Sequence, residues 1–245
     1  SGLLDKTGAI KPLGLERQSW WSPKPVVSIA RRTASAQLAP TDPGFVPLNR
    51  LQVQFADWSP ANREAHDENV EVFSNCDSVE LFLNDKSLGA QPLNADASPR
   101  TWKVVFAPGA LRAVAKNKDA VVATTELRTA GAPARIVLST NRKKLARSFE
   151  EVAEITALVV DVNGVTVPSG DSLVSFAASG AGAVVATDSA DNASHAAFQS
   201  AERAAFRGRC VAFVKATAPS GAITITATAP GLAKGTVLLE AGNVR

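Results

Sequence analysis

The sequence predicts an all-β protein made of two consecutive β-sandwich domains, with one short helix before them. Short runs in which apolar and polar residues alternate recur along most of the chain, and turn residues separate them, as is typical of half-buried strands. A break that contains glycine and proline, at residues 129–133, divides these runs into two series. With 245 residues, the chain is long enough for each series to build its own core.

The predicted helix covers Leu13 to Trp21. Pro12 suits its first turn, and Ser22-Pro23 ends it because proline cannot continue a helix. The spacing of a helix places four residues on one face, namely Leu13, Arg17, Trp20 and Trp21. Tryptophan rings can stack on sugars, but in helices they usually pack against protein, so we expect this face to contact a protein surface.

Residues 28–49 are predicted to form a linker without strands. Proline restricts the residue before it to extended conformations and removes a backbone donor. The prolines of this segment are Pro40, Pro43 and Pro47. We therefore expect it to wrap over a surface between residues 1–27 and a first sandwich at residues 50–130.

The stretch from Val70 to Gly89 is the clearest strand signal of the first domain. Alternation places Val70 and Val72 on one face of a strand and continues in a second strand that ends at Leu83. Polar residues at 75–78 predict a turn between these strands, and Asn84-Asp85, which tolerate left-handed dihedrals, predict the next turn. We expect a β-meander, with further strands at residues 51–55, 101–106, 111–115 and 121–127.

The second domain, residues 131–245, has strands expected at residues 135–138, 154–160, 173–176, 210–215 and 223–227. Asn163-Gly164 is a strong hairpin signal. Residues 188–198 are too many, and too rich in Asp, Asn and Ser, for a plain hairpin. We expect a structured loop held by side-chain-to-backbone hydrogen bonds, with Phe198 and Phe206 as its apolar anchors.

Composition and charge exclude several classes of function. The net charge is +3 and basic residues are dense only at 142–147, which argues against a nucleic-acid partner. No apolar run reaches the length of a membrane span, so we expect no membrane partner. The chain has two histidines, His66 and His195, and two distant cysteines, Cys76 and Cys210. We therefore expect no metal site, no cofactor and two buried free thiols.

No residue of this chain is predicted to be catalytic. Ser194 and His195 are neighbours in the sequence, which gives no reason to pair them as nucleophile and base, and a Gly-x-Ser-x-Gly motif is absent. The adjacent acids Glu150 and Glu151 fall in a predicted loop, where solvated side chains are the simpler interpretation.

Several strings resemble one family of enzymes. Residues 74–89, SNCDSVELFLNDKSLG, are similar to SNCDEVELFLNGKSLG in a β-sandwich that follows the catalytic barrel of bacterial family-two glycoside hydrolases, the β-galactosidase-like group. Residues 1–27 resemble the last loop and helix of that barrel, and DWSPANREAHDENVEV resembles the same sandwich. The strings AGAPARIVLST, VDVNGVTVPSGDSLVSF and TDSADNASHAAFQSAERAAFRGRC resemble the family's immunoglobulin-like terminal domain. The matches occur in the family's order over nearly the whole chain.

The resemblance implies two immunoglobulin-like sandwiches preceded by a remnant of a (β/α)8 barrel. It also implies that the two catalytic glutamates of a retaining β-glycosidase lie upstream of Ser1. We therefore expect this chain alone to be inactive and the whole enzyme to hydrolyse β-galactosides. The expected partner is the barrel, which would face Leu13, Trp20 and Trp21. Because the chain has no methionine and opens without a leader, we expect a piece of a longer polypeptide.

Four residues are candidates for supporting a sugar site. Asp191, Asn192 and His195 lie in the predicted polar loop, which either satisfies its own backbone or leans toward the barrel and shapes a sugar subsite or an interface. Trp58 either packs in the core or at an interface, or it stacks on sugar.

A different class of function stays open, namely an independent carbohydrate-binding or adhesive tandem of Ig-like domains. Such a tandem needs exposed aromatic residues on a sheet or loop rim. The chain has no tyrosine and four tryptophans, which disfavours this alternative. Self-association through the tryptophan face is a further expectation when the barrel is missing. A periplasmic or secreted location is favoured over a cytoplasmic one, and the sugar and linkage stay open.

Overall fold

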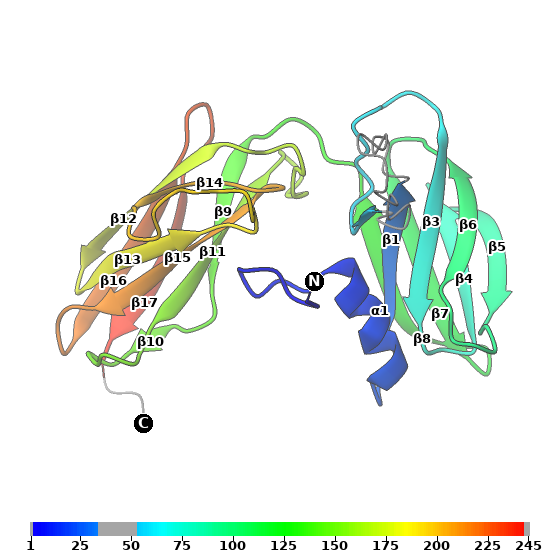
Figure 1. Ribbon diagram of the computed structural model, residues 1–245, viewed down its shortest axis with the longest axis horizontal. Helices are drawn as coiled ribbons and strands as arrows, with labels where there is room; N and C mark the ends of the chain where they lie inside the picture. Colours follow the sequence, from blue (N-terminus) through cyan, green and yellow to red (C-terminus); the bar gives the residue numbers. More distant parts are fainter. Residues whose placement is uncertain (1, 34–52, 243–245) are drawn as a thin grey trace, which may run out of the picture. The chain divides into compact units, whose positions relative to one another are not determined.

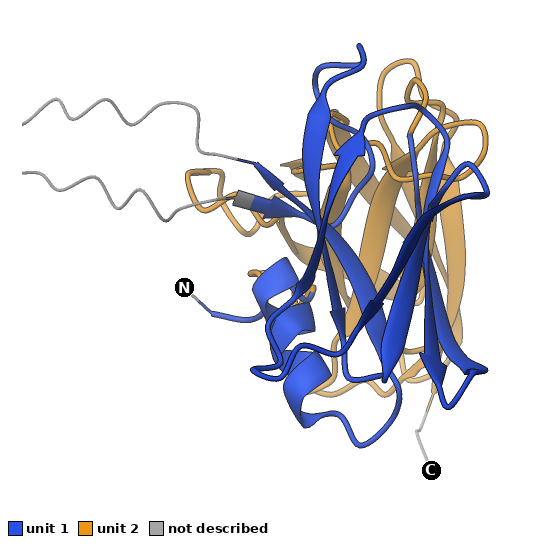
Figure 2. Ribbon diagram, turned by 90° about the vertical axis from the view of Figure 1, so that its right-hand side faces the viewer, with its two compact units in different colours: residues 1–4, 10–129 blue, residues 5–9, 130–245 orange. Residues whose placement is uncertain are grey.

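The computed structural model describes residues 2–33 and 53–242, and these contain one helix and seventeen strands. The chain forms two compact units, which Figure 2 distinguishes by colour. The first unit holds residues 1–4 and 10–129, and the second holds residues 5–9 and 130–245. Each unit carries two β-sheets that face each other across an apolar core, so the predicted all-β fold is confirmed.

The first sandwich is built from antiparallel strands. Its strands are β1 (Val27–Thr33), β2 (Val53–Phe55), β3 (Asp67–Ser74), β4 (Ser78–Leu83), β5 (Lys86–Pro92), β6 (Arg100–Val105), β7 (Ala110–Asn117) and β8 (Ala120–Arg128). One sheet has the order β2-β1-β3-β6 and the other has the order β5-β4-β7-β8. All these strands except β2 are labelled in Figure 1.

Two tight turns of this sandwich follow their sequence signals. Asn84 and Asp85 join β4 to β5 with φ angles of 49° and 64°, and Lys118 and Asp119 join β7 to β8 with φ angles of 47° and 68°. Two consecutive left-handed residues make a turn whose twist matches that of antiparallel strands. The predicted turn at Asn84-Asp85 is therefore confirmed.

The expected meander through β3 and β4 is wrong. Residues 75–77 carry the chain from one sheet to the other, so these two strands are not paired. The Asn75 side chain fixes this crossing, because it accepts the N–H of Val26 and donates to the carbonyls of Ser22 and Lys24. Cys76 follows, fully buried in the core. Alternation predicts which face a strand buries, but it does not predict the strand's partner.

The linker expected at residues 28–49 is wrong over its first part. Residues Val27–Thr33 form β1, which lies between β2 and β3, and Ile29, Ala30 and Arg31 are buried in it. The prolines that favoured a strand-free segment all follow this strand. The rest of the expected linker and residues 51–52 of the expected first strand lie outside the described residues.

The helix α1 (Pro12–Trp21) begins and ends where the two prolines predict. The backbone N–H of Ser22 donates to the carbonyl of Gln18 at its end. The helix packs against β1 and β3 (Figure 1), and its buried residues are the small Gly14 and Ser19. A Cβ atom added at Gly14 would lie 2.6 Å from the carbonyl oxygen of Leu3, so this close packing requires glycine.

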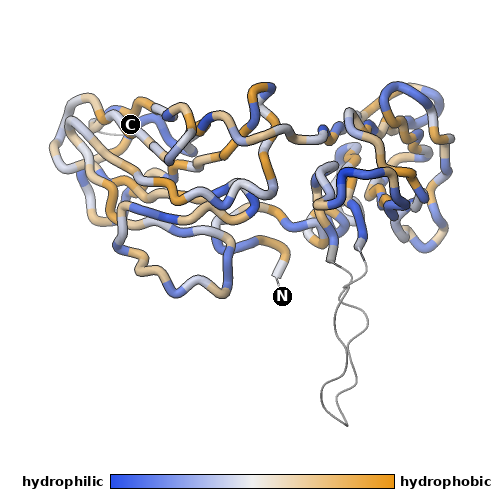
Figure 3. The backbone as a smooth tube through the Cα atoms, turned by 90° about the horizontal axis from the view of Figure 1, so that it is seen from above, coloured by the Kyte–Doolittle hydropathy of each residue, from blue (hydrophilic) through white to orange (hydrophobic). Residues whose placement is uncertain are grey.

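Apolar side chains from both sheets fill the first sandwich. In β6 the inward Trp102 and Val104 alternate with exposed residues, and Figure 3 shows hydrophobic and hydrophilic residues interleaved along the chain in both units. Trp58 enters the core from the loop between β2 and β3, where its ring centroid lies 5.2 Å from that of Phe106. The period-2 pattern of the sequence therefore supplies this core.

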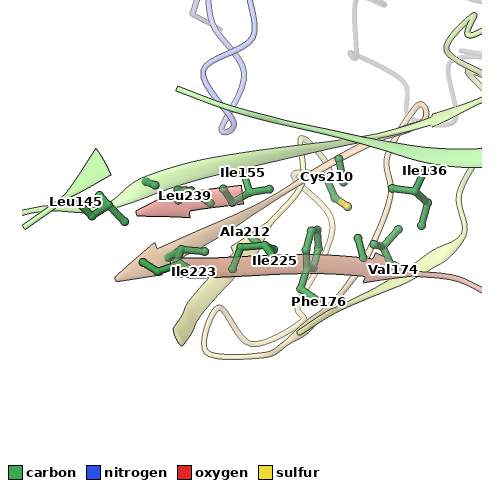
Figure 4. Close-up of a cluster of buried hydrophobic side chains, with 14 of the residues drawn as sticks. Ile136, Leu145, Ile155, Val174, Phe176, Cys210, Ala212, Ile223, Ile225 and Leu239 are labelled. Atoms are coloured by element: carbon green, nitrogen blue, oxygen red, sulfur yellow. The ribbon is translucent and has the colours of Figure 1, made fainter. Parts of the chain in front are cut away.

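The second sandwich has a sheet of order β10-β17-β16-β12-β14 and a sheet of order β13-β15-β11-β9. Its strands are β9 (Arg135–Thr140), β10 (Lys144–Leu145), β11 (Ala153–Val160), β12 (Leu173–Gly180), β13 (Gly182–Asp188), β14 (Glu202–Ala204), β15 (Arg209–Ala216), β16 (Gly221–Thr228) and β17 (Gly235–Ala241). Figure 4 shows Ile155, Ile223 and Phe176 among the apolar side chains of its core, together with Cys210.

Asn163-Gly164, where the sequence predicts a hairpin, form a tight turn that is closed by a single bridge. Gly164 adopts a φ angle of 83°, and the flanking residues Val160 and Thr166 form one antiparallel bridge. The next strand, β12, begins only at Leu173. The turn is therefore present, but the chain after it forms only this bridge with the last residue of β11.

Candidate functional site

The loop between β13 and β14, residues 189–201, carries three of the four residues predicted to support a sugar site. Its position is fixed by Arg203 of β14, which is buried. The guanidinium donates to the carbonyl oxygens of Thr187 at 2.7 Å, Ala196 at 3.1 Å and Ala197 at 2.6 Å. These are charge-assisted hydrogen bonds, so one side chain ties the middle of the loop to its base.

The apolar anchors expected for this loop are wrong. Phe198 is 58% exposed and Phe206 is 39% exposed, so neither ring holds the loop from the core. Arg203 does so instead, although arginine is rarely buried and is therefore a weak signal in a sequence. Its only signal is alternation, since it lies between the exposed Glu202 and Ala204 in β14.

The three loop candidates differ in what they contact. Asp191 serves its own loop, because its carboxylate accepts the backbone N–H of Ala193 at 2.9 Å. Asn192 and His195 are exposed, and neither side chain is hydrogen-bonded to another described residue. The role of Asp191 is therefore to bind the backbone of its own loop, while the side chains of Asn192 and His195 are exposed and available to a partner.

A turn near the N-terminus, residues 5–9, belongs to the second unit and lies against this loop. Lys6 Nζ donates to the carbonyl oxygen of Asp191 at 2.8 Å and lies 3.5 Å from Oδ1 of the buried Asp188. Arg209 of β15 donates to the carbonyl oxygen of the buried Thr7 at 3.3 Å. The polar loop is therefore in contact with a segment that precedes α1 in the sequence.

Asp5 gives this turn its shape. Its Oδ1 accepts the backbone N–H of Thr7 at 2.8 Å, the hydroxyl of Thr7 at 2.7 Å and the backbone N–H of Ala9 at 3.0 Å. Gly8 adopts a φ angle of 74°, a conformation that residues with side chains rarely adopt. The turn is thus internally bonded, which lowers the entropy lost when it lies against the sandwich.

Trp58 takes the core position rather than a sugar-stacking one. It is fully buried, and its Nε1 donates to the carbonyl oxygen of Ala107 at 3.0 Å. Because the ring has no exposed face, it is closed to a sugar in this structure.

Leu13, Trp20 and Trp21 lie on the exposed side of α1. Trp21 is 73% exposed, and its ring packs edge-on against that of Trp20, with 6.1 Å between centroids. Trp20 is oriented by the guanidinium of Arg17, 4.0 Å from its ring centroid, and donates from Nε1 to the carbonyl of Ala97 at 3.2 Å. The helix buries small residues and exposes apolar ones, which is the reverse of a helix on a solitary domain.

Comparison with known proteins identifies the family. Residues 136–238 match the model of Glycoside hydrolase family 2 C-terminal domain 5, and residues 67–123 match a domain of unknown function, DUF4982. The crystal structure of a glycosyl hydrolase family 2 member from Bacteroides cellulosilyticus matches 98% of this chain with a TM-score of 0.86 at 29% identity. The chain belongs to glycoside hydrolase family 2.

Two further relatives support this assignment. A β-galactosidase from Bacteroides ovatus is 32% identical over 169 residues, which cover 69% of this chain and 20% of that protein. The crystal structure of a β-glycosidase from Bacteroides vulgatus matches 98% of the chain with a TM-score of 0.84 at 26% identity. The chain spans 31% of the B. cellulosilyticus structure and 28% of the B. vulgatus structure. It corresponds to the C-terminal region of family 2 enzymes, as its sequence strings predict.

Glu16 on α1 and Glu71 on β3 are two acids whose charges interact. Burial raises the pKa of Glu16, the charges of Arg17 and Arg32 oppose this rise, and the charge of Glu71 adds to it. Glu71 is buried, and its Oε2 accepts Nη2 of Arg32 at 2.9 Å and Nε2 of Gln54 at 2.7 Å. Arg32 and Gln54 therefore hold Glu71 within the sheet on which α1 packs.

Asp161 is the one acid of the turn at residues 161–165, and its carboxylate is satisfied by backbone groups. Its Oδ1 accepts the backbone N–H groups of Asn163 and Val165, and its Oδ2 accepts that of Gly131 at 2.8 Å. These bonds, led by the one from Gly131, lower the pKa of Asp161.

Within residues 2–33 and 53–242, no group of three or more His, Cys, Asp or Glu side chains is arranged to hold a metal ion.

Two further features bear on reactivity and membranes. Both cysteines are buried and free, and burial raises the pKa of Cys210 to about 12, which keeps its thiol protonated and unreactive. Among the described residues, no helix has the length and apolar character needed to cross a membrane.

Proposed function

We propose that this chain is the non-catalytic C-terminal portion of a retaining, β-galactosidase-like glycosidase that hydrolyses terminal β-galactosides. In this proposal the two sandwiches serve domain packing and active-site support, and the two catalytic carboxylates belong to a barrel upstream of α1. Membership of family 2 and similarity to a β-galactosidase support it. The observation that carries the proposal is the outward apolar face of α1.

Exposure of Leu13, Trp20 and Trp21 to water is energetically unfavourable. A packed tryptophan side chain buries about 150–250 Å², and apolar burial stabilises by about 25 cal/mol per Å². Arg17 and the Ala97 carbonyl hold Trp20, so part of the ordering entropy of a docking contact is already lost. The relatives contain much more polypeptide than the 20–31% that matches this chain. We propose that the catalytic barrel of the same enzyme packs over Leu13, Trp20 and Trp21.

The polar loop has a second role in this proposal. Asn192 and His195 are exposed and available, and the loop contacts Lys6 of a turn that the family resemblance assigns to the end of the barrel. We propose that Asp191 shapes the loop while Asn192 and His195 contact either the barrel or a sugar beside it. In the intact enzyme, loss of sugar contacts raises KM, whereas loss of a barrel contact lowers thermal stability.

The alternative function, an autonomous carbohydrate-binding or adhesive tandem, has less support. Binding modules of that kind present aromatic rings together on a sheet or rim. The exposed aromatic rings of the described residues occur on α1 and in loops or turns, and none lies in a strand. They are Trp20, Trp21, Phe149, Phe198 and Phe206.

The proposal is tested by the joint substitution Trp20→Ser and Trp21→Ser. In the purified chain we expect wild type to self-associate through the bare face of α1 and the double variant to sediment as a monomer. In the intact enzyme the same substitutions are expected to weaken the attachment of this region, detected as faster proteolysis before α1 and lower turnover of an aryl β-galactoside.

The matched control is Phe149→Ser, which removes an aromatic ring that is 91% exposed on the second sandwich. It should leave sedimentation and turnover unchanged. If the tryptophan variant behaves like this control in both assays, α1 does not dock the barrel and the proposal fails.

A further inference from the structure

His66, in the loop between β2 and β3, has both ring nitrogens against hydrogen-bond acceptors. Nδ1 lies 2.7 Å from the backbone carbonyl oxygen of Glu64, and Nε2 lies 3.0 Å from Oε1 of Glu68. A carbonyl oxygen has no hydrogen to donate. The same Glu68 oxygen also accepts Nη1 of Arg31 at 3.0 Å, so it serves as the acceptor for both side chains.

The chemistry of imidazole therefore restricts the state of this ring. A neutral histidine carries one N–H and can donate to only one of the two oxygens. Both contacts exist together only when both nitrogens carry a hydrogen, which is the positively charged ring. This conclusion follows from the positions of Glu64, Glu68 and Arg31 around the ring.

The groups that face His66 come from three elements. Glu68 lies on β3, and Arg31 on β1 reaches the same carboxylate oxygen; both are buried. The uncharged ring of Phe106, which follows β6, lies 5.6 Å from the imidazole. The hydrogen bond to the Glu64 carbonyl, followed by that to Glu68, raises the pKa of His66 above its ordinary value of 6.5, and the charge of Arg31 opposes this rise.

The contacts of His66 also hold backbone. Its carbonyl oxygen accepts the N–H of Phe106 at 2.8 Å, which joins the end of the loop to the end of β6. Its ring reaches back to Glu64, whose own N–H donates to the side chain of Asn62 at 3.0 Å. When the ring loses a proton, either the Glu64 carbonyl is released or the link to Glu68 is lost.

We propose that His66 is a pH-sensitive clamp, which holds the loop of residues 59–66 on the first sandwich when its ring is charged and releases one end of it when the ring is neutral. Because the folded protein favours the protonated ring, the stabilisation is complete below about pH 6.5 and is lost as pH rises through the folded-state pKa. The proposal concerns the first sandwich and is independent of the proposed function.

The first test uses the full chain and the nitrogen resonances of its imidazole rings. The chain has two histidines, so the variant His195→Gln leaves His66 as the only signal. We expect more than half of the His66 rings to carry both hydrogens at pH 6.5. A ring that is mostly neutral at that pH overturns the proposal.

The second test measures hydrogen exchange at the Phe106 amide between pH 6 and pH 9, corrected for the intrinsic dependence of exchange on base. Loss of one hydrogen bond should speed exchange about fivefold as His66 becomes neutral. His66→Gln keeps a neutral donor toward Glu68 but cannot titrate, so this step should disappear. A step that persists in the variant assigns the effect to another group and overturns the clamp. If the variant does not fold, the titration of His66 in His195→Gln decides the matter.

Discussion

The two sandwiches bury charged side chains in different ways. In the first, Arg31 on β1 lies between two acids, with Nη2 2.8 Å from Asp57 in the loop after β2 and Nη1 3.0 Å from Glu68 on β3. In the second, Arg203 donates to backbone carbonyls in the loop of residues 189–201 and at its base, and Asp161 accepts backbone N–H groups of its own turn and of Gly131. Paired side chains therefore join β1 to β3 and to the loop after β2, whereas charged groups that bind backbone fix the path of the chain around them.

The two sandwiches therefore use their charged groups to stabilise different parts of the structure. The first sandwich uses Arg31 and Glu71 within the sheet that α1 covers, so charge holds the surface on which the helix packs. The second sandwich keeps an apolar core and uses charge at its loops. Arg100 in the first sandwich follows the second pattern, because it donates to the carbonyls of Pro92, Ser74 and Cys76.

The largest effect is expected for Arg31→Met. It leaves Glu68 buried without its arginine, and removing one partner of a buried ion pair costs about 3–5 kcal/mol. Urea unfolding of the first sandwich should show this loss. A cost below about 1 kcal/mol would mean that the pair is solvated as a surface pair is, and the contrast between the two domains would not hold.

Arg203→Met should have the next largest effect. It leaves carbonyl groups unsatisfied but no unpaired charge, so we expect a cost of about 2–3 kcal/mol and faster proteolysis within residues 189–201. Arg147→Met is the control, since Arg147 is exposed and its replacement should change neither quantity. Equal behaviour of the two variants would contradict the role of Arg203 as the anchor of the loop.

Asp161→Asn is expected to cost about 1–2 kcal/mol at pH 6, because an amide cannot accept all the backbone N–H groups that the carboxylate accepts. The pKa of Asp161 is lower in the folded protein, so its contribution is present above the ordinary value of 3.8 and is lost as pH falls through the folded-state pKa. Wild type and variant should therefore converge in thermal stability toward pH 2. A gap that stays constant would show that the carboxylate charge is irrelevant.

His195→Ala should have the smallest effect. Its ring is exposed and not hydrogen-bonded to another described residue, so the free energy of unfolding should change by less than about 0.5 kcal/mol. Chemical denaturation of the chain checks this value. A larger loss would restore the view that this side chain holds the loop, as the sequence alone allows.

Much of the fold could be predicted from local patterns. The alternation around Val70 and Val79 marks real strands, and Asn84-Asp85 form the turn that their tolerance of positive φ predicts. Pairing could not be predicted, because the crossing at Asn75 depends on hydrogen bonds to residues about fifty positions away. The same limit hid β1, whose register is set by β3 rather than by its own sequence.

The site was less predictable than the fold. Helical spacing correctly groups Leu13, Trp20 and Trp21, but it cannot say whether that face lies inward or outward, and here Gly14 and Ser19 take the inward side. The polar loop was visible in the sequence as a run of Asp, Asn and Ser. Its anchor was not, because the burial of Arg203 arises from the carbonyls that the folded loop brings around it.

The most direct test of the central claim is turnover of an aryl β-galactoside by the purified chain, with contaminating glycosidase excluded by assaying a mock purification. We expect no hydrolysis by the chain alone, and hydrolysis with retained anomeric configuration by the enzyme that also contains the upstream barrel. Hydrolysis by the chain alone would contradict the account, because it would require a catalytic carboxylate pair within these two sandwiches.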